Sequence, residues 1–358
     1  MRVAMLHPTY WPEVRRGAER IVNGLARWLA SEGHEVTLLT THRAARAETT
    51  EDGVRVVRAW RPPDRLTARR AYEDYLATIP MQARDLLRGE YDVAHAFHSV
   101  SAWAALQARR RGGPPVVFTS TGITTRGYLV ARRYRMEMNL TDAAASAACS
   151  VFSEAAAIPF ERYLLRRPEV IPPGVDLEAF AGDTPRAKAP TIAYTGSLAD
   201  PRKRLPLLFD AFSDLRDERP DARLVLAGKR EPWLELDLPE GAECLPGDPT
   251  EAVPGVLASA HVAVLPSVEE GFGVALVEAL AAGTPVVAAR SGAGPEIVTN
   301  GVGELFEPDS RDALATALAK ALDLGDVAAA CRDHAARWDW SAIGPRYEEL
   351  LRRAAATS

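Results

Sequence analysis

Cysteine, lysine and long apolar runs are scarce in this chain of 358 residues. Its three cysteines, Cys149, Cys244 and Cys331, are odd in number and far apart, which favours free thiols in a reducing compartment over a disulfide framework. No apolar run approaches the roughly 20 residues that span a bilayer. The N-terminus also becomes polar too early for a signal peptide. We therefore expect a cytoplasmic protein with free thiols and no metal site built on them.

The charge of the chain is divided unevenly between its halves. Residues 1–180 contain 25 arginines, no lysine and 20 acidic residues, whereas the whole chain has a formal net charge of −5. The first half is basic and the second acidic, which suggests two units with different partners. The basic half could attract an anionic molecule or an anionic membrane surface, and we expect no nucleic-acid partner. A coding bias is the alternative, because arginines outnumber lysines by 39 to 4.

Short β-type runs alternate with amphipathic helical patterns along the whole chain. This alternation predicts parallel sheets covered by helices, and the length predicts two domains. We expect helices over 17–30, 101–110 and 205–216, a last helix from about residue 340, and a linker within 170–190. The expected strands are 2–6, 35–40, 54–59, 92–97, 115–119 and 148–152, followed in a second unit by 191–194, 223–227, 261–265 and 285–289.

Segment 267–287 carries the strongest functional signal. From Val274 to Ala282 every residue is apolar except Glu278, and a helix that is apolar all round is a buried helix. A lone carboxylate there costs several kcal/mol unless something pairs with it. Just upstream, Glu270 and two glycines stand at the expected helix start, where free N–H groups favour an anion and glycine lets a ligand come close. The segment therefore indicates a ligand site.

The spacing of the two glutamates narrows the ligand. If Glu270 and Glu278 were both helical, they would lie about 12 Å apart along the axis. They could then hold the two ends of one long polar molecule whose anionic middle meets the glycine amides. A nucleoside diphosphate sugar fits this description. The alternative is that Glu270 only caps the helix and Glu278 forms an ion pair with an arginine.

Several other polar residues follow predicted strands. Arg202 and Lys203 come after the turn at Gly196 and Ser197, and both cations suit a diphosphate. A solvated cation pair is the alternative. Gly17 opens a helix after the first strand, where it would allow close approach of a ligand.

The end of the strand expected over 92–97 supplies a histidine. His98 could act as a base, bind a hydroxyl or have a structural role. Ser120 and Thr121 end the next strand and could line the same edge of the sheet. Neither a Ser-His-Asp order nor an Asp-x-Asp metal signature is present.

With these residues in place, the chain resembles the retaining family 4 glycosyltransferases of the GT-B fold. Glu270 and Glu278 match the Glu-x7-Glu motif of that family, and 281–287 matches the segment that follows it. Weaker support comes from 17–20, 171–176 and 200–203. The resemblance implies an α/β protein with two doubly wound Rossmann-like domains facing a central cleft. Residues 1–172 with a crossing helix over 340–356 would bind the acceptor, and residues 173–339 the donor.

The resemblance also implies roles for individual residues. Glu270 would contact hydroxyls of the transferred sugar, and Glu278 would hold the ribose. Arg202 and Lys203 would neutralise the departing diphosphate in place of a metal, so that no cofactor besides the nucleotide-sugar co-substrate is expected. The remaining donor-binding positions would be Gly17, Gly196, Ser197, Gly271, Phe272, Gly273 and Val274. Retention in this family is usually explained by front-face attack without a protein nucleophile.

The chain departs from the family pattern at three positions. Arg16 replaces the first glycine of the usual Gly-Gly pair. Ser120 and Ser197 stand where phosphatidylinositol mannosyltransferases carry His and Arg. The acceptor is therefore either a small molecule or a lipid-linked hydroxyl, and the base and sugar of the donor stay open. Peripheral contact with an anionic inner membrane face would use the arginine clusters at 61–70 and 132–135.

Two alternatives to a transferase are a GT-B-fold sugar-nucleotide epimerase and a non-catalytic sugar-nucleotide-binding partner. The pairing of the two glutamates with Arg202 and Lys203 favours transfer over both.

Overall fold

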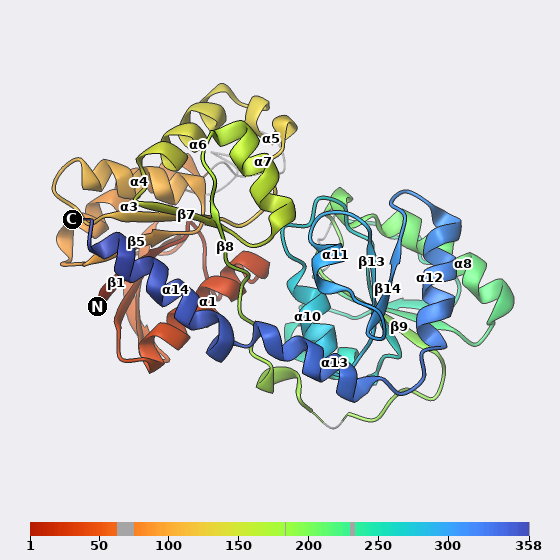
Figure 1. Cartoon of the computed structure of the whole chain (residues 1–358). Coiled ribbons are helices and arrows are strands. Elements are labelled where there is room, and N and C mark those ends of the chain that lie inside the picture. The colour runs from red at the N-terminus through yellow and green to blue at the C-terminus, as the bar shows by residue number, and fades with distance from the viewer. Residues whose placement is uncertain (63–74, 183, 230–232, 358) are drawn as a thin grey trace. The chain divides into compact units, whose positions relative to one another are not determined.

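The computed structural model describes residues 1–62, 75–182, 184–229 and 233–357. It divides into two compact units, each with its own sheet (Figure 1). The N-terminal unit comprises Met1–Gly174 together with the chain from Trp340 onward, and the C-terminal unit comprises Val175–Asp339. The sequence placed the division at 172 and 173, two residues earlier.

The N-terminal unit is built on an eight-stranded sheet in the order β3-β4-β2-β1-β5-β6-β7-β8. All neighbouring strands are parallel except β3 and β4, which are antiparallel. The predicted strands fall within two residues of the observed ones. The strands are β1 (Arg2–Leu6), β2 (Glu35–His42), β3 (Ala47–Glu51), β4 (Val54–Trp60), β5 (Val93–Ala96), β6 (Val116–Ser120), β7 (Ala148–Val151) and β8 (Glu169–Val170).

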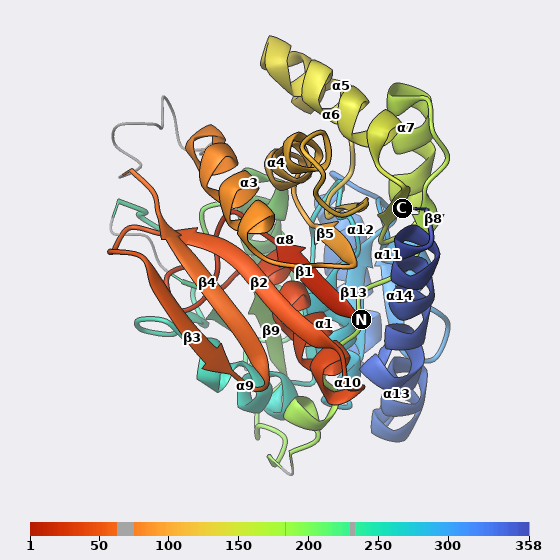
Figure 2. The same cartoon turned by 90° about the vertical axis from the view of Figure 1, so that its left-hand side faces the viewer.

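The sequence missed both edge strands of this sheet, namely β8, which is only two residues long, and β3 at the opposite edge (Figure 2). The residues of β3 are Ala-Glu-Thr-Thr-Glu, and they are mostly exposed. An edge strand pairs on one side only and tolerates polar side chains on both faces, so it lacks the apolar pattern that reveals a strand.

Helices cover both faces of the N-terminal sheet. Alternate strand residues face opposite sides, and those typified by Ala4, Leu6 and Phe118 form one apolar core with Phe160 and other helical residues. The helices of this unit are α1 (Gly17–Ser31), α3 (Ile79–Arg88), α4 (Ser99–Arg109), α5 (Arg126–Val130), α6 (Arg133–Ala145), α7 (Glu154–Leu164) and α14 (Trp340–Ala355).

Helix α14 belongs to the N-terminal unit although it ends the described chain, and it lies along α1 (Figure 1). The indole of Trp340 lies so close to Gly24 and Gly174 that a Cβ on either glycine would overlap it. A second contact comes from α1, whose Trp28 ring lies against Gly344 of α14. The buried Tyr347 hydroxyl also donates to the carbonyl of Ile171. These contacts make α14 part of the core of this unit.

The C-terminal unit contains a six-stranded, all-parallel sheet in the order β11-β10-β9-β12-β13-β14. Its strand order changes direction between β9 and β12, which is the position where open α/β sheets bind ligands. The strands are β9 (Thr191–Thr195), β10 (Arg223–Ala227), β11 (Ala242–Cys244), β12 (Val262–Leu265), β13 (Val286–Ala289) and β14 (Gly303–Phe306). The helices are α8 (Leu205–Glu218), α9 (Val253–Ser259), α10 (Val274–Ala281), α11 (Gly294–Ile297), α12 (Arg311–Leu322) and α13 (Ala328–Ala335).

Two strands of the C-terminal unit, β11 and β14, were not predicted. Both are short strands at the edges of the sheet and both contain a glutamate. Among the helices that the structure describes, none is long and apolar enough to cross a membrane.

Candidate functional site

The turn after β9 is shaped by a glycine and a buried tyrosine. Gly196 has a φ of +146°, which favours glycine, and its N–H donates to the carbonyl of Ala227. The hydroxyl of Tyr194 donates to the carbonyl of Ser197 at 2.8 Å, and burial raises the pKa of this phenol. Ser197 itself is exposed. The turn therefore leads the chain out of the sheet into the short 3-10 helix η3 (Pro201–Lys203).

The two cations of η3 have different partners. Arg202 is about half exposed, and its guanidinium contacts the Asp200 carboxylate at 2.7 and 3.2 Å. Burial raises the pKa of Asp200, but the hydrogen bonds and charge of Arg202 outweigh this effect and the pKa is lowered overall. Lys203 instead forms an ion pair with Glu270, in which Nζ and Oε2 are 2.7 Å apart.

The Lys203–Glu270 ion pair joins the segments that follow two neighbouring strands, β9 and β12. The side chains of Lys203 and Glu270 are 17% and 26% exposed, so the ion pair is partly buried but still reaches solvent. The backbone adds a second link, because the Val268 N–H donates to the carbonyl of Arg202. The structure thus brings together two residues that the sequence singled out separately.

Glu270 lies in the loop before α10 and not in the helix. The helix begins at Val274, after Gly273 at a φ of +91°. The 12 Å separation calculated for a continuous helix from Glu270 to Glu278 therefore does not apply. No side chain caps this helix at Gly273, so its first N–H groups favour an anion.

Glu278 and Phe272 are both buried residues of this segment. Glu278 is 3% exposed and lies in the second turn of the apolar α10. Phe272 is 5% exposed, and its ring packs edge-on against Trp338 at 6.0 Å between centroids. The ring of Phe272 is therefore part of the packing of this unit. Gly271 is likewise buried, whereas Val274 is half-buried.

In the N-terminal unit, Gly17 is the first residue of α1 and a Cβ built on it would meet nothing within 4 Å. Space is therefore open beside the backbone of Gly17.

The start of α1 is held by Glu19, which the sequence analysis missed. Its buried carboxylate accepts from the N–H of Arg16 at 3.2 Å and from the hydroxyl of Thr9 at 2.7 Å. The signal that could have revealed it is the position of a glutamate three residues after the N-cap.

His98 ends the strand region of β5 and caps α4. Its Nδ1 accepts from the N–H of Val100, so the neutral ring carries its proton on Nε2. His7, which the sequence analysis missed, ends the neighbouring strand β1. Its Nδ1 lies 2.7 Å from the carbonyl of Thr9, so Nδ1 carries a proton. The two rings are 6.3 Å apart between centroids.

Ser120 and Thr121 follow β6, the strand next to β5. The hydroxyl of Ser120 donates to the carbonyl of Gly122 at 3.3 Å, and Thr121 is half-buried in the following loop. His7, His98 and Ser120 thus end three neighbouring strands at the same edge of the N-terminal sheet.

The arginine cluster predicted at 61–70 is only partly described. Residues 63–70 lie outside the described residues. Arg61 is buried, and its guanidinium forms an ion pair with Glu13 at 2.6 Å, so the prediction of a surface cation at this position is wrong. In the second cluster, Arg132 lies between α5 and α6 and Arg133 is the first residue of α6, and both are exposed.

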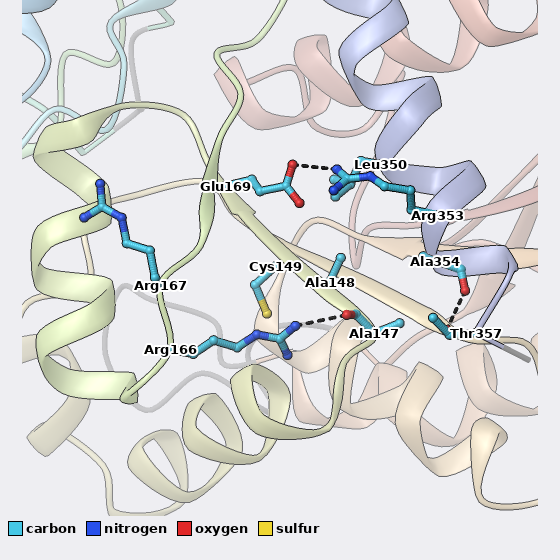
Figure 3. A pocket seen from close by; sticks show the side chains of 10 residues that line it. All are labelled: Ala147, Ala148, Cys149, Arg166, Arg167, Glu169, Leu350, Arg353, Ala354 and Thr357. Carbon is cyan, nitrogen blue, oxygen red and sulfur yellow. Dashed lines mark hydrogen bonds and ion pairs between the residues drawn. The ribbon is translucent and has the colours of Figure 1, made fainter.

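A pocket of about 190 Å³ on the N-terminal unit carries several arginines (Figure 3). The guanidinium of Arg166 donates to three backbone carbonyls, and Arg353 pairs with Glu169 at 2.7 Å. Because these cations are satisfied by the protein itself, the pocket does not resemble an anion site. Across the described part of the chain, no group of three or more His, Cys, Asp or Glu side chains could hold a metal.

Two family models together match most of the chain. The model described as "Glycosyltransferase Family 4" matches residues 15–179, and the one described as "Glycosyl transferases group 1" matches residues 178–338. A GDP-mannose-dependent α-(1-6)-phosphatidylinositol monomannoside mannosyltransferase from Mycolicibacterium smegmatis is 30% identical over 326 residues, which cover 76% of this chain and 80% of that protein. A phosphatidyl-myo-inositol mannosyltransferase from Propionibacterium freudenreichii is 28% identical and covers 97% and 93%.

Solved structures share the fold over nearly the full length. Sucrose-phosphate synthase from Thermosynechococcus elongatus matches with a TM-score of 0.82 at 20% identity, covering all of both chains. Anabaena Alr3699/HepE in complex with UDP-glucose matches with a TM-score of 0.74 at 19% identity, covering 98% and 99%. Sequence and structure agree with the predicted class, and the chain belongs to the family 4 glycosyltransferases, enzymes with the GT-B fold.

Proposed function

We propose that this glycosyltransferase takes a hexose-type sugar from a nucleoside diphosphate sugar held by the C-terminal unit. The observation that carries the proposal is the Lys203–Glu270 ion pair beside the uncapped start of α10. A diphosphate requires positive charge and N–H donors, which Lys203, Arg202 and the start of α10 provide. Sugar hydroxyls are suited to a carboxylate, which Glu270 provides. The remaining carboxylate, Glu278, is proposed to hold the ribose.

The ion pair defines what must change when the donor binds. In the described structure the ammonium group of Lys203 is neutralised by Glu270. A phosphate of the donor would compete for this ammonium group, so that the carboxylate becomes available to the sugar. The turn at Gly196 and Ser197 and the N–H groups from Gly271 to Val274 would complete the donor contacts.

We propose that transfer retains the configuration at the anomeric carbon and needs no metal. The acceptor hydroxyl oxygen bonds to the anomeric carbon on the face from which the diphosphate leaves, and a leaving phosphate oxygen takes the hydroxyl proton. No protein nucleophile is required for this step. Arg202 and Lys203 would stabilise the negative charge that develops on the diphosphate. The alternatives of an epimerase or a non-catalytic partner gain no support from relatives that are named as transferases.

The donor proposal is tested by Glu270→Ala with Glu269→Ala as its matched control. Glu269 is the exposed neighbouring carboxylate. We expect E270A to lower kcat by about 10²-fold or more, the usual cost of removing a group that stabilises a transition state, whereas E269A stays near wild type. The assay is release of nucleoside diphosphate from UDP-, GDP- and ADP-sugars, chosen first by a thermal-shift panel. Full activity of E270A would overturn the role of Glu270.

For the acceptor, we propose a small or lipid-linked hydroxyl compound bound by the N-terminal unit. The names of two relatives support a lipid-linked acceptor. Gly17, His98, Ser120 and Thr121 are the proposed contacts. The proposed role of His98 is to bind the acceptor hydroxyl, as a hydrogen-bond partner or as a base.

We further propose peripheral contact of the enzyme with an anionic membrane through the α5–α6 segment. Val130 is 59% exposed and Tyr128 is 38% exposed there, with Arg126, Arg132 and Arg133 exposed around them. Apolar side chains fringed by arginines suit the surface of an anionic bilayer. Vesicles containing anionic lipid should pull down wild type at low salt, less at high salt, and less for the R132E/R133E variant. Absence of binding at low salt would remove this proposal.

A further inference from the structure

We propose that Gly292, in the loop after β13, is a positioning residue that fixes the backbone of Glu270. The inference rests on the proposed role of Glu270 and extends it to a residue outside the Glu-x7-Glu segment. Gly292 is half-buried. In the sequence, the whole of α10 and β13 separates it from Glu270.

Glu270 is held from both sides by loops of neighbouring strands. Strand β12 lies between β9 and β13, so the loops that follow these three strands emerge at one edge of the sheet. On the β9 side, Lys203 contacts the Glu270 carboxylate. On the β13 side, the N–H of Ala293 donates to the Glu270 carbonyl at 3.1 Å. The carboxylate is thus positioned by one loop and the backbone by the other.

Gly292 makes the close approach on the β13 side possible. Its φ is +56°, and a Cβ built on it would lie 2.5 Å from the carbonyl oxygen of Glu270 and 2.8 Å from its nitrogen. Real Cβ atoms essentially never come closer than 3.0 Å to another heavy atom. Both colliding atoms belong to the backbone, so no flexible side chain can move aside. Either the loop or Glu270 must shift.

The loop is anchored more firmly than Glu270. The Arg290 N–H donates to the carbonyl of Phe306 in β14 at 2.8 Å. Within the loop, the Ser291 N–H donates to the carbonyl of Ala289 at 2.7 Å, and the Gly294 N–H donates to the carbonyl of Ser291 at 3.3 Å. Glu270, by contrast, lies in an irregular segment between Glu269 at a φ of +56° and Gly273 at +91°. A side chain at position 292 would therefore displace mainly Glu270, and a displacement of about 1 Å in a positioned group can cost 10²-fold in rate.

Gly292→Ala and Gly292→Asn test the inference, with Gly247→Ala as the matched control. Gly247 also has a positive φ, +69°, but a Cβ on it would meet nothing within 4 Å. The control therefore shares the backbone strain without the collision. Asparagine tolerates a positive φ better than alanine, so G292N keeps the collision while it relieves the strain.

Calorimetry with GDP and GDP-mannose, and with UDP and UDP-glucose, gives a readout specific to the sugar end of the donor. We expect both Gly292 variants to bind the nucleoside diphosphates within about threefold of wild type, because Lys203 and the start of α10 are untouched. The additional affinity that the sugar provides should fall about tenfold, with kcat for donor turnover falling 10- to 100-fold. G247A should match wild type in both measurements.

A double variant separates this inference from the proposed function. If Gly292 acts through Glu270, G292A should slow turnover by less than about twofold in the E270A background. If the effects of the two changes multiply, or if both Gly292 variants fail to fold while G247A folds, the positioning role is overturned. If E270A itself keeps the sugar-dependent affinity and turnover, the proposed function of Glu270 fails first.

Discussion

His95 makes the stability of the N-terminal unit depend on pH. It lies in β5 with no exposed surface, its ring is 4.1 Å from that of Phe97 between centroids, and its Nε2 is 2.7 Å from the hydroxyl oxygen of Thr119. Burial lowers the pKa of this imidazole from 6.5 to about 3. The folded protein therefore keeps the ring neutral at pH values where the unfolded chain binds a proton.

The sign and size of the effect follow from this difference. The contribution of His95 to stability is present above pH 6.5 and is lost as the pH falls from 6.5 toward 3, because only the unfolded state gains a proton there. At pH 5 the pH is about 1.5 units below the pKa of 6.5 that His95 has in the unfolded chain, so the unfolded chain binds a proton at this residue. At 1.36 kcal/mol per unit, the free energy of unfolding should fall by about 2 kcal/mol through this one residue.

The variant His95→Gln isolates the effect. A glutamine amide reaches the position of Nε2 and can keep the contact with Thr119, but it does not titrate. Urea unfolding of both proteins at pH 7 and pH 5 gives two losses of free energy, and wild type should lose about 2 kcal/mol more than H95Q. The difference between wild type and H95Q is needed because burial also lowers the pKa values of His261 and His334, which add to the pH dependence of both proteins. Equal losses in the two proteins would refute the reasoning.

Two further predictions concern thiol reactivity and helix packing. In native protein, Cys244 should react with a disulfide reagent before Cys149 and Cys331, because burial raises the pKa values of those two thiols to about 12 and about 11; equal labelling rates would contradict this. Gly344→Ala should lower stability by about 1–3 kcal/mol although alanine favours helices, because its Cβ would overlap a tryptophan ring of α1. The control Gly255→Ala in α9, with no atom nearer than 4.0 Å, should raise the melting temperature, and a matching loss in both would rule out the packing explanation.

The central strands and the helix α10 could be predicted from the sequence because burial on both sides leaves continuous apolar runs. The edge strands β3, β8, β11 and β14 could not, since their pairing depends on neighbours that the local sequence does not reveal. The same limit applies to the site. Lys203 and Glu270 were each recognised after a predicted strand, but that they would meet depends on β9 and β12 being adjacent in the sheet.

His7 and Gly292 show what local patterns conceal. His7 lies in a run that was interpreted as a buried first strand, and its tautomer depends on the carbonyl of Thr9 beyond the strand end. Gly292 follows a correctly predicted strand, and its importance appears only when the distance to the Glu270 backbone is known. Two glycines within five residues of a strand end were the available signal.

The return of α14 to the N-terminal unit also sets an order for folding during synthesis. Domains usually complete in the order in which they leave the ribosome. Here the ring of Trp340 fills the space beside Gly24 and Gly174, so the N-terminal core stays incomplete until the last helix has been made. The C-terminal unit, whose residues are continuous from Val175 to Asp339, can complete first. The unit that begins the chain is therefore the last to close.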